Sequence, residues 1–170
     1  RVSRITIVAN GDEYVVEQLE KQLSIGLVFQ DFNLFPQYNV LENITLAPKL
    51  LAKKRPDYKT NKAEIIKKIE NNALELLKKS GLENKVNSYP CQLSGGQQQK
   101  VAIARAIIKT PPVILADEPT GNLDPVSGEE VMNILRSLNC NGSTVLMITH
   151  DMRCAEMTDR IIKIKEGEIK

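Results

Sequence analysis

The stretch "VILADEPTGNLD", residues 113–124, predicts a buried strand that ends in two acidic side chains. Its first four residues form an apolar run, which is typical of a strand inside a parallel sheet. Asp117 and Glu118 follow directly, at the carboxyl end where open α/β sheets bind their ligands. Because neighbouring strand residues point to opposite faces, we expect the two carboxylates to act separately. One could hold magnesium and the other could orient a water molecule; the alternative is an exposed acidic turn.

The stretch "LSGGQQQKVAIARA", residues 93–106, places two glycines and three glutamines at the head of an apolar helix. Glycine lets other atoms approach the main chain closely. A helix start also has unpaired N–H groups and the positive end of the helix dipole, which together favour an anion. The pattern therefore predicts a phosphate contact at the head of this helix, which involves Ser94, Gly95, Gly96 and Gln97.

Two further polar residues follow predicted strands. Gln30 comes directly after the apolar residues 25–29, "IGLVF", and His150 comes after residues 144–149, "TVLMIT". Each has an ordinary alternative, which is a loop residue for Gln30 and a structural cap for His150. Because parallel strands end at the same edge of a sheet, we expect His150 to lie on the same edge as Asp117. An imidazole there could contact a terminal phosphate or the attacking water.

The periodicity of the chain changes twice, which indicates an α/β part and a helical part. Strands are predicted at residues 4–8 and 14–16 around an Asn10-Gly11 turn, and a short helix at residues 17–23. Helical spacing at residues 40–51 and 62–79 indicates an all-helical block, and the α/β alternation returns after residue 110 and ends in a hairpin that turns at Gly167. We predict an α/β fold with a parallel sheet, in which residues 1–30 and 111–170 form the core and residues 31–110 form an inserted all-helical subdomain.

The composition excludes several classes of function. The 170 residues carry a formal net charge of only +2, and no basic run alternates with aromatic residues, so we expect no nucleic-acid partner. No apolar run approaches the ~20 residues that span a bilayer, and no secretory signal is visible. The three cysteines are scattered, which favours reduced thiols over a disulfide or a metal site.

The order of these motifs along the chain resembles that in the ATP-binding subunits of ABC transporters. The resemblance extends from Ile25 to Lys170 and includes Gln30, the signature segment "LSGGQ" of residues 93–97, "ILADEP" at 114–119, "LD" at 123–124 and His150. It implies the cofactors ATP and Mg²⁺, catalytic roles for Glu118, His150 and Gln30, and Mg²⁺ contacts for Asp117 and Gln30. It also implies that ATP is contacted by Ser94, Gly95, Gly96, Gln97 and Asp124. Lys100 stands where the family commonly has arginine, with the charge kept.

One expected motif is absent from the sequence. The family's phosphate loop, G-x-x-x-x-G-K-[ST], would precede Gln30, but no such pattern occurs. We therefore expect an incomplete P-loop NTPase-type sheet and no ATP hydrolysis by this chain alone. Three interpretations remain: the loop is not recorded in the sequence, the chain is a fragment, or the subunit is naturally degenerate. The intact remaining motifs favour the first two.

The resemblance also implies partners. These are a second nucleotide-binding subunit, identical or paralogous, whose ATP faces the signature segment, and a membrane-embedded permease, which places the protein peripherally at the cytoplasmic face of the cell membrane. Residues 28–48 look like importers of polar amino acids, whereas residues 115–124 and 150–169 look closer to lipoprotein-release, macrolide-efflux or cell-division subunits. We favour amino-acid uptake. Export and a non-catalytic fragment that supplies only the signature half-site stay open. A chromosome-maintenance ATPase would need long coiled coils, and no sustained heptads occur.

Overall fold

The computed structural model describes residues 5–9, 12–16, 25–165 and 168–169, and the side chains of residues 25–164. Its central feature is a parallel sheet in the order β3-β4-β5, formed by Ile25–Val28, Val113–Asp117 and Thr144–Ile148. The register pairs Val28 with Ala116 and Asp117 with Ile148, so the three carboxyl ends meet at one edge. This sheet confirms the predicted α/β class.

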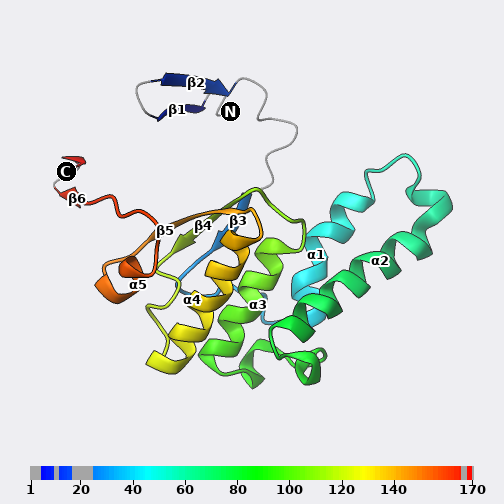
Figure 1. The fold of residues 1–170 in the computed structure, drawn as a ribbon. Coiled ribbons are helices and arrows are strands. Elements are labelled where there is room, and N and C mark those ends of the chain that lie inside the picture. Colours follow the sequence, from blue (N-terminus) through cyan, green and yellow to red (C-terminus); the bar gives the residue numbers. More distant parts are fainter. Residues whose placement is uncertain (1–4, 10–11, 17–24, 166–167, 170) are drawn as a thin grey trace.

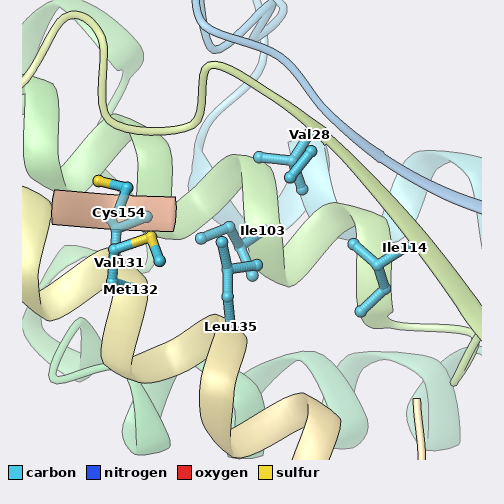
Figure 2. Close-up of a cluster of buried hydrophobic side chains, with 8 residues drawn as sticks. Val28, Ile103, Ile114, Val131, Met132, Leu135 and Cys154 are labelled. Carbon is cyan, nitrogen blue, oxygen red and sulfur yellow. The ribbon is translucent and has the colours of Figure 1, made fainter. Parts of the chain in front are cut away.

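Two helices cover one face of the sheet. α3 (Gly95–Ile107) and α4 (Pro125–Cys140) run side by side across it, and the short α5 (Met152–Glu156) follows β5 (Figure 1). Gly26 allows α3 to approach β3, because a Cβ there would lie 3.1 Å from the Ala106 carbonyl oxygen. The core between these layers contains Val28, Ile103, Ile114, Ala116, Val131, Met132, Leu135 and Cys154 (Figure 2). Their close packing is the main source of stability in this half.

The opposite face of the sheet is open within the described part of the chain. Leu27 is 46%, Leu146 54% and Ile148 64% exposed. The near-continuous apolar run at residues 25–29 predicts a buried strand, as is usual in parallel sheets. That prediction is wrong for the described structure, where the strand alternates between exposed and buried residues because helices pack on one face only.

The helical block consists of α1 (Val40–Ala52) and α2 (Tyr58–Lys79), which pack against each other and against α3 (Figure 1). Asn39 and Glu42 form a capping box that fixes the start of α1. α2 begins at Tyr58, before the predicted residue 62, and Asn61 interrupts its helical geometry with φ −113°. Two short 3₁₀ turns, Glu83–Lys85 and Pro90–Gln92, connect α2 to α3. The second core contains Val40, Ile44, Ala73, Leu77, Leu82, Leu93, Val101 and Ala104.

α3 contributes to both cores. Ile103 packs with the sheet and α4, whereas Val101 and Ala104 pack with α1 and α2. The proposed division at residues 30 and 110 assigns α3 to the helical subdomain, and this division stays a prediction. A helix shared by both cores is suited to transmit a shift of one part to the other.

The remaining elements are two hairpins. β1 (Ile5–Ala9) pairs antiparallel with β2 (Asp12–Val16), and β6 (Ile164–Lys165) pairs with β7 (Glu168–Ile169). The helix predicted at residues 17–23 and the turn predicted at Gly167 lie outside the described residues. Among the helices that are described, none is both long and apolar enough to cross a membrane.

Candidate functional site at the carboxyl edge of the sheet

The sheet brings Glu118 and His150 into direct contact, whereas the sequence predicts only that His150 lies on the same edge as Asp117. The His150 ring Nδ1 lies 2.7 Å from Glu118 Oε1, and the His150 main-chain N–H donates to the same oxygen at 3.0 Å. Thr149 Oγ1 donates to Glu118 Oε2 at 3.2 Å. The carboxylate is therefore held at both oxygens, while the imidazole is 85% exposed and free to meet a ligand.

The main chain at Glu118 is specialised. Its φ is 42°, in the left-handed region that side-chain-bearing residues seldom adopt. Its N–H donates to the Ile148 carbonyl oxygen, which extends the pairing of β4 with β5 beyond Asp117. Backbone strain of this kind concentrates at functional sites. Here it turns the Glu118 side chain toward the end of β5.

Asp117 is the free carboxylate of the pair. It ends β4 and is exposed, and within the part of the chain that the structure describes its side chain makes no hydrogen bond or ion pair. No group of three potential metal-ligating side chains occurs among the described residues. Mg²⁺ commonly uses only one or two carboxylates and takes its other ligands from phosphate and water. Asp117 fits that donor set, and Gln30, whose Oε1 makes no hydrogen bond among the described residues, can supply a second oxygen.

Gln30 is hydrogen-bonded to the loop that follows Glu118 rather than to Glu118 itself. Its Nε2 donates to Asn122 Oδ1 at 3.3 Å, and Asn122 Nδ2 donates back to the Gln30 carbonyl oxygen at 3.2 Å and to Asp31 Oδ1 at 3.0 Å. A Cβ on Gly121 would lie 2.7 Å from Gln30 Nε2, so a side chain there would displace the Gln30 amide. Asn122 was not predicted as a site residue, although it lies inside the motif 113–124.

The signature segment starts α3 with a capping box. Gln97 N–H donates to Ser94 Oγ at 3.3 Å, and Ser94 N–H donates to Gln97 Oε1 at 3.1 Å. The N–H groups of Gly95 and Gly96 have no hydrogen-bond partner among the described residues. An unpaired N–H at a helix start can donate to an anion, but Gly96 is itself buried, and the phosphate contact expected at these two residues stays a prediction.

Gly96 also has a structural function inside the chain. A Cβ at this residue would lie 2.6 Å from Ser127 Oγ and 2.7 Å from Ser127 Cβ, at the start of α4. The sequence interpretation of the glycine pair considered only a ligand that approaches the main chain. Part of the explanation is instead the close packing of α3 on α4.

We expect Gly96→Ala to lower the free energy of unfolding by about 1–3 kcal/mol, the usual cost of overpacking. Urea unfolding measures it. Adding Ser127→Gly should recover most of the loss because it removes both nearby atoms, whereas adding Ser127→Ala should not, since its Cβ stays. Equal recovery by both second substitutions would contradict the steric explanation.

Asp124 caps α4. Its Oδ1 accepts from the N–H groups of Val126 at 3.1 Å and Ser127 at 3.0 Å. Hydrogen bonds from Ser127, side chain first and then main chain, hold the pKa of Asp124 below its usual value. A contact of Asp124 with ATP stays a prediction. Within the described residues, no hydrogen bond joins Asp124, the signature segment or Gln30 to the Glu118–His150 pair.

Three buried or half-buried polar side chains hold the segment around Gln30, and sequence reasoning did not identify them. Arg105 donates to the carbonyl oxygens of Phe32 (3.0 Å) and Asn33 (2.6 Å), both of which have positive φ. Burial lowers the pKa of the Arg105 guanidinium. Asn43 and Gln99 bind other main-chain groups of this segment. The available signal was a polar residue within the apolar face of a helix.

Comparisons with known proteins agree with this geometry. Residues 6–121 match the family model described as "ABC transporter". The chain belongs to the ABC transporter family. The cell division ATP-binding protein FtsE of Streptococcus pneumoniae is 42% identical over 147 residues, which are 86% of this chain and 59% of that protein. The arginine transport ATP-binding protein ArgV of Corynebacterium glutamicum is 43% identical over 151 residues, 88% of this chain and 56% of that protein.

A solved ABC cassette shares the fold. The dimeric, post-hydrolysis structure of the ATP-binding cassette MJ0796 of Methanocaldococcus jannaschii, bound to ADP and Pi, superposes with a TM-score of 0.72 at 38% identity, and covers 97% of this chain and 71% of that one. The chain spans about three fifths of the length of FtsE and ArgV.

Proposed function

We propose that this chain is part of the ATP-binding and ATP-hydrolysing subunit of an ABC transporter. The observation that carries the proposal is the Glu118 carboxylate, held by Thr149 and His150 at the carboxyl edge of a parallel sheet, next to the carboxylate of Asp117, which makes no hydrogen bond or ion pair with a described residue. Two neighbouring carboxylates, one held in place and one free, match the two acidic roles in nucleotide hydrolysis.

Each side chain has a task that its geometry permits. Glu118 orients the attacking water, and His150, which is exposed and hydrogen-bonded to Glu118, contacts the terminal phosphoryl group or that water. Asp117 and Gln30 would hold Mg²⁺ together with phosphate oxygens, and the ion would neutralise the developing phosphate charge. Gln30 precedes the helical block in the chain, and its bond to Asn122 joins it to the loop that follows Glu118.

The signature segment serves a second nucleotide. The N–H groups of Gly95 and Gly96 and the side chain of Ser94 lie at the start of α3, and no hydrogen bond among the described residues joins them to the Glu118–His150 pair, which fits an ATP molecule bound mainly by a partner subunit. The dimeric form of the cassette MJ0796 supports such pairing. Asp124 would approach the same interface.

The transported substrate is determined by the membrane and binding partners of such a subunit. We favour uptake of a polar amino acid, supported by the likeness of residues 28–48 to importers and by the relative named for arginine transport. The alternative is an export or cell-division complex, supported by residues 115–124 and the relative named for cell division. A gene for an extracytoplasmic binding protein beside this one supports import; a gene for a large permease with an extracytoplasmic domain contradicts it.

ATP turnover by two forms of the protein tests the proposal. Residues 1–170 alone should show no turnover above background, because no G-x-x-x-x-G-K-[ST] loop holds the β- and γ-phosphates. Turnover should appear when the chain is continuous with that loop, and removal of Mg²⁺ by chelation should abolish it. Turnover by residues 1–170 alone would contradict the expected need for that loop, and no turnover in the complete protein would contradict the proposed function.

A further inference from the structure

Gln99 is a fully buried amide in the middle of α3. Its side chain has 0% exposure, and it faces the carboxyl edge of the sheet rather than solvent. Its Nε2 donates to the Phe29 carbonyl oxygen at 3.2 Å and to the Pro119 carbonyl oxygen at 2.7 Å. Both partners are acceptors, so only the NH₂ end of the amide can face them.

The two carbonyl groups belong to residues that are adjacent in the sequence to two residues of the proposed site. Phe29 immediately precedes Gln30, and Pro119 immediately follows Glu118. Both lie just beyond the ends of their strands, β3 at Val28 and β4 at Asp117, where the sheet no longer pairs the main chain. One side chain therefore fixes the main chain next to two residues of the proposed site, and does so from the helix that begins with the signature segment.

Packing alone does not explain an amide at this position. Gln99 Oε1 is buried and has no hydrogen-bond partner within the described residues, which is an unfavourable arrangement. A methionine of similar length would fill the same volume without a buried orphan acceptor. The feature that methionine lacks is the pair of hydrogen bonds to Phe29 and Pro119.

We propose that Gln99 is a positioning residue for ATP hydrolysis, which sets the main chain beside Gln30 and Glu118 in register with the signature helix. This inference rests on the proposed function of the site. Gln99 is fully buried and acts through Gln30 and Glu118. Misplacement of a reacting group by about 1 Å can cost about a hundredfold in rate, so two fixed carbonyl groups can have a large effect.

The experiment measures kcat and KM for ATP in the complete protein. Gln99→Met should lower kcat by about 10- to 100-fold and change KM less than about threefold. Val131→Ala is the matched control, since Val131 is also fully buried in the sheet core but binds no site segment. It should lower the midpoint of thermal unfolding and leave kcat within about twofold.

A double variant separates positioning from general destabilisation. In a Gln30→Ala background, the fold-reduction of kcat caused by Gln99→Met should be at least about threefold smaller than in the wild type. The reason is that Gln99 acts through Gln30 and Glu118, and the Gln30 side chain is already absent. The cost of Val131→Ala should be the same in both backgrounds. If Gln99→Met is insoluble, Gln99→Asn, whose shorter side chain draws the amide back from both carbonyl groups, should give the same kcat loss.

The outcomes distinguish the two proposals. A kcat for Gln99→Met within twofold of Val131→Ala, or the same cost in both backgrounds, overturns the positioning role. Glu118→Gln is measured in parallel: if it retains turnover, the proposed function of the site fails as well. Loss of turnover in Glu118→Gln together with normal kcat in Gln99→Met overturns the inference about Gln99 alone.

Discussion

In the complete protein, Glu118→Gln is expected to reduce ATP turnover by about 10²–10⁴-fold, the usual contribution of a positioned acid–base group, and to preserve ATP binding. The replacement fits the site. A glutamine oxygen can still accept from the His150 N–H, and its NH₂ group can face Thr149 Oγ1, which also accepts. What disappears is the negative charge that orients and activates the attacking water.

Two measurements test this expectation, namely steady-state phosphate release and equilibrium binding of labelled ATP. Glu130→Gln is a matched control, because Glu130 is an exposed carboxylate on α4 that pairs with Lys100 at 2.9 Å and makes no hydrogen bond to Glu118 or His150 among the described residues. It should leave turnover within about twofold. Unchanged turnover in Glu118→Gln would show that the catalytic carboxylate has been assigned to the wrong residue. Loss of ATP binding would instead indicate that Glu118 holds Mg²⁺, the role proposed for Asp117.

That His150 lies on the same sheet edge as Asp117 and Glu118 was predictable from sequence, because it depends on topology; the contact between Glu118 and His150 also needs the positive φ of Glu118. Apolar runs identified β4 and β5, and parallel strands that are adjacent in a sheet must end at the same edge. The residue that follows each strand then falls at that edge. The same reasoning placed Gln30 at the end of β3, but not its bond to Asn122, which depends on the path of a loop.

Contacts that depend on side-chain register between elements were not predictable. Gln99 reaches Phe29 and Pro119 because of how α3 is rotated about its axis and how far along the sheet it lies. A sequence motif predicts neither of these two quantities. The same limit explains Gly96: its neighbour Ser127 comes from a different motif, so the sequence suggested a ligand and the structure adds a packing partner. The early start of α2 was missed because its first residues lack an apolar face and Asn61 breaks the periodicity.

His150→Ala is expected to lower turnover by about a hundredfold or more without loosening the fold. The imidazole is 85% exposed, so its removal takes little packing from the protein, and the midpoint of thermal unfolding should stay within about 1 °C. Glu118 should keep its place, because the His150 main-chain N–H and Thr149 Oγ1 do not depend on the ring. The loss would then come from the imidazole itself, at the phosphate or the water.

Thr149→Val provides the converse case. It removes the Oγ1 donor to Glu118 and the acceptor for the Asp151 N–H, yet leaves the ring of His150 in place. If the imidazole acts on the nucleotide, Thr149→Val should reduce kcat less than His150→Ala does, since Glu118 retains both of its contacts with His150. If the imidazole only holds Glu118, the two variants should lose similar activity, because each removes one of the contacts that fix the same carboxylate. The ratio of the two kcat values therefore decides whether His150 contacts the reacting groups or acts only through Glu118.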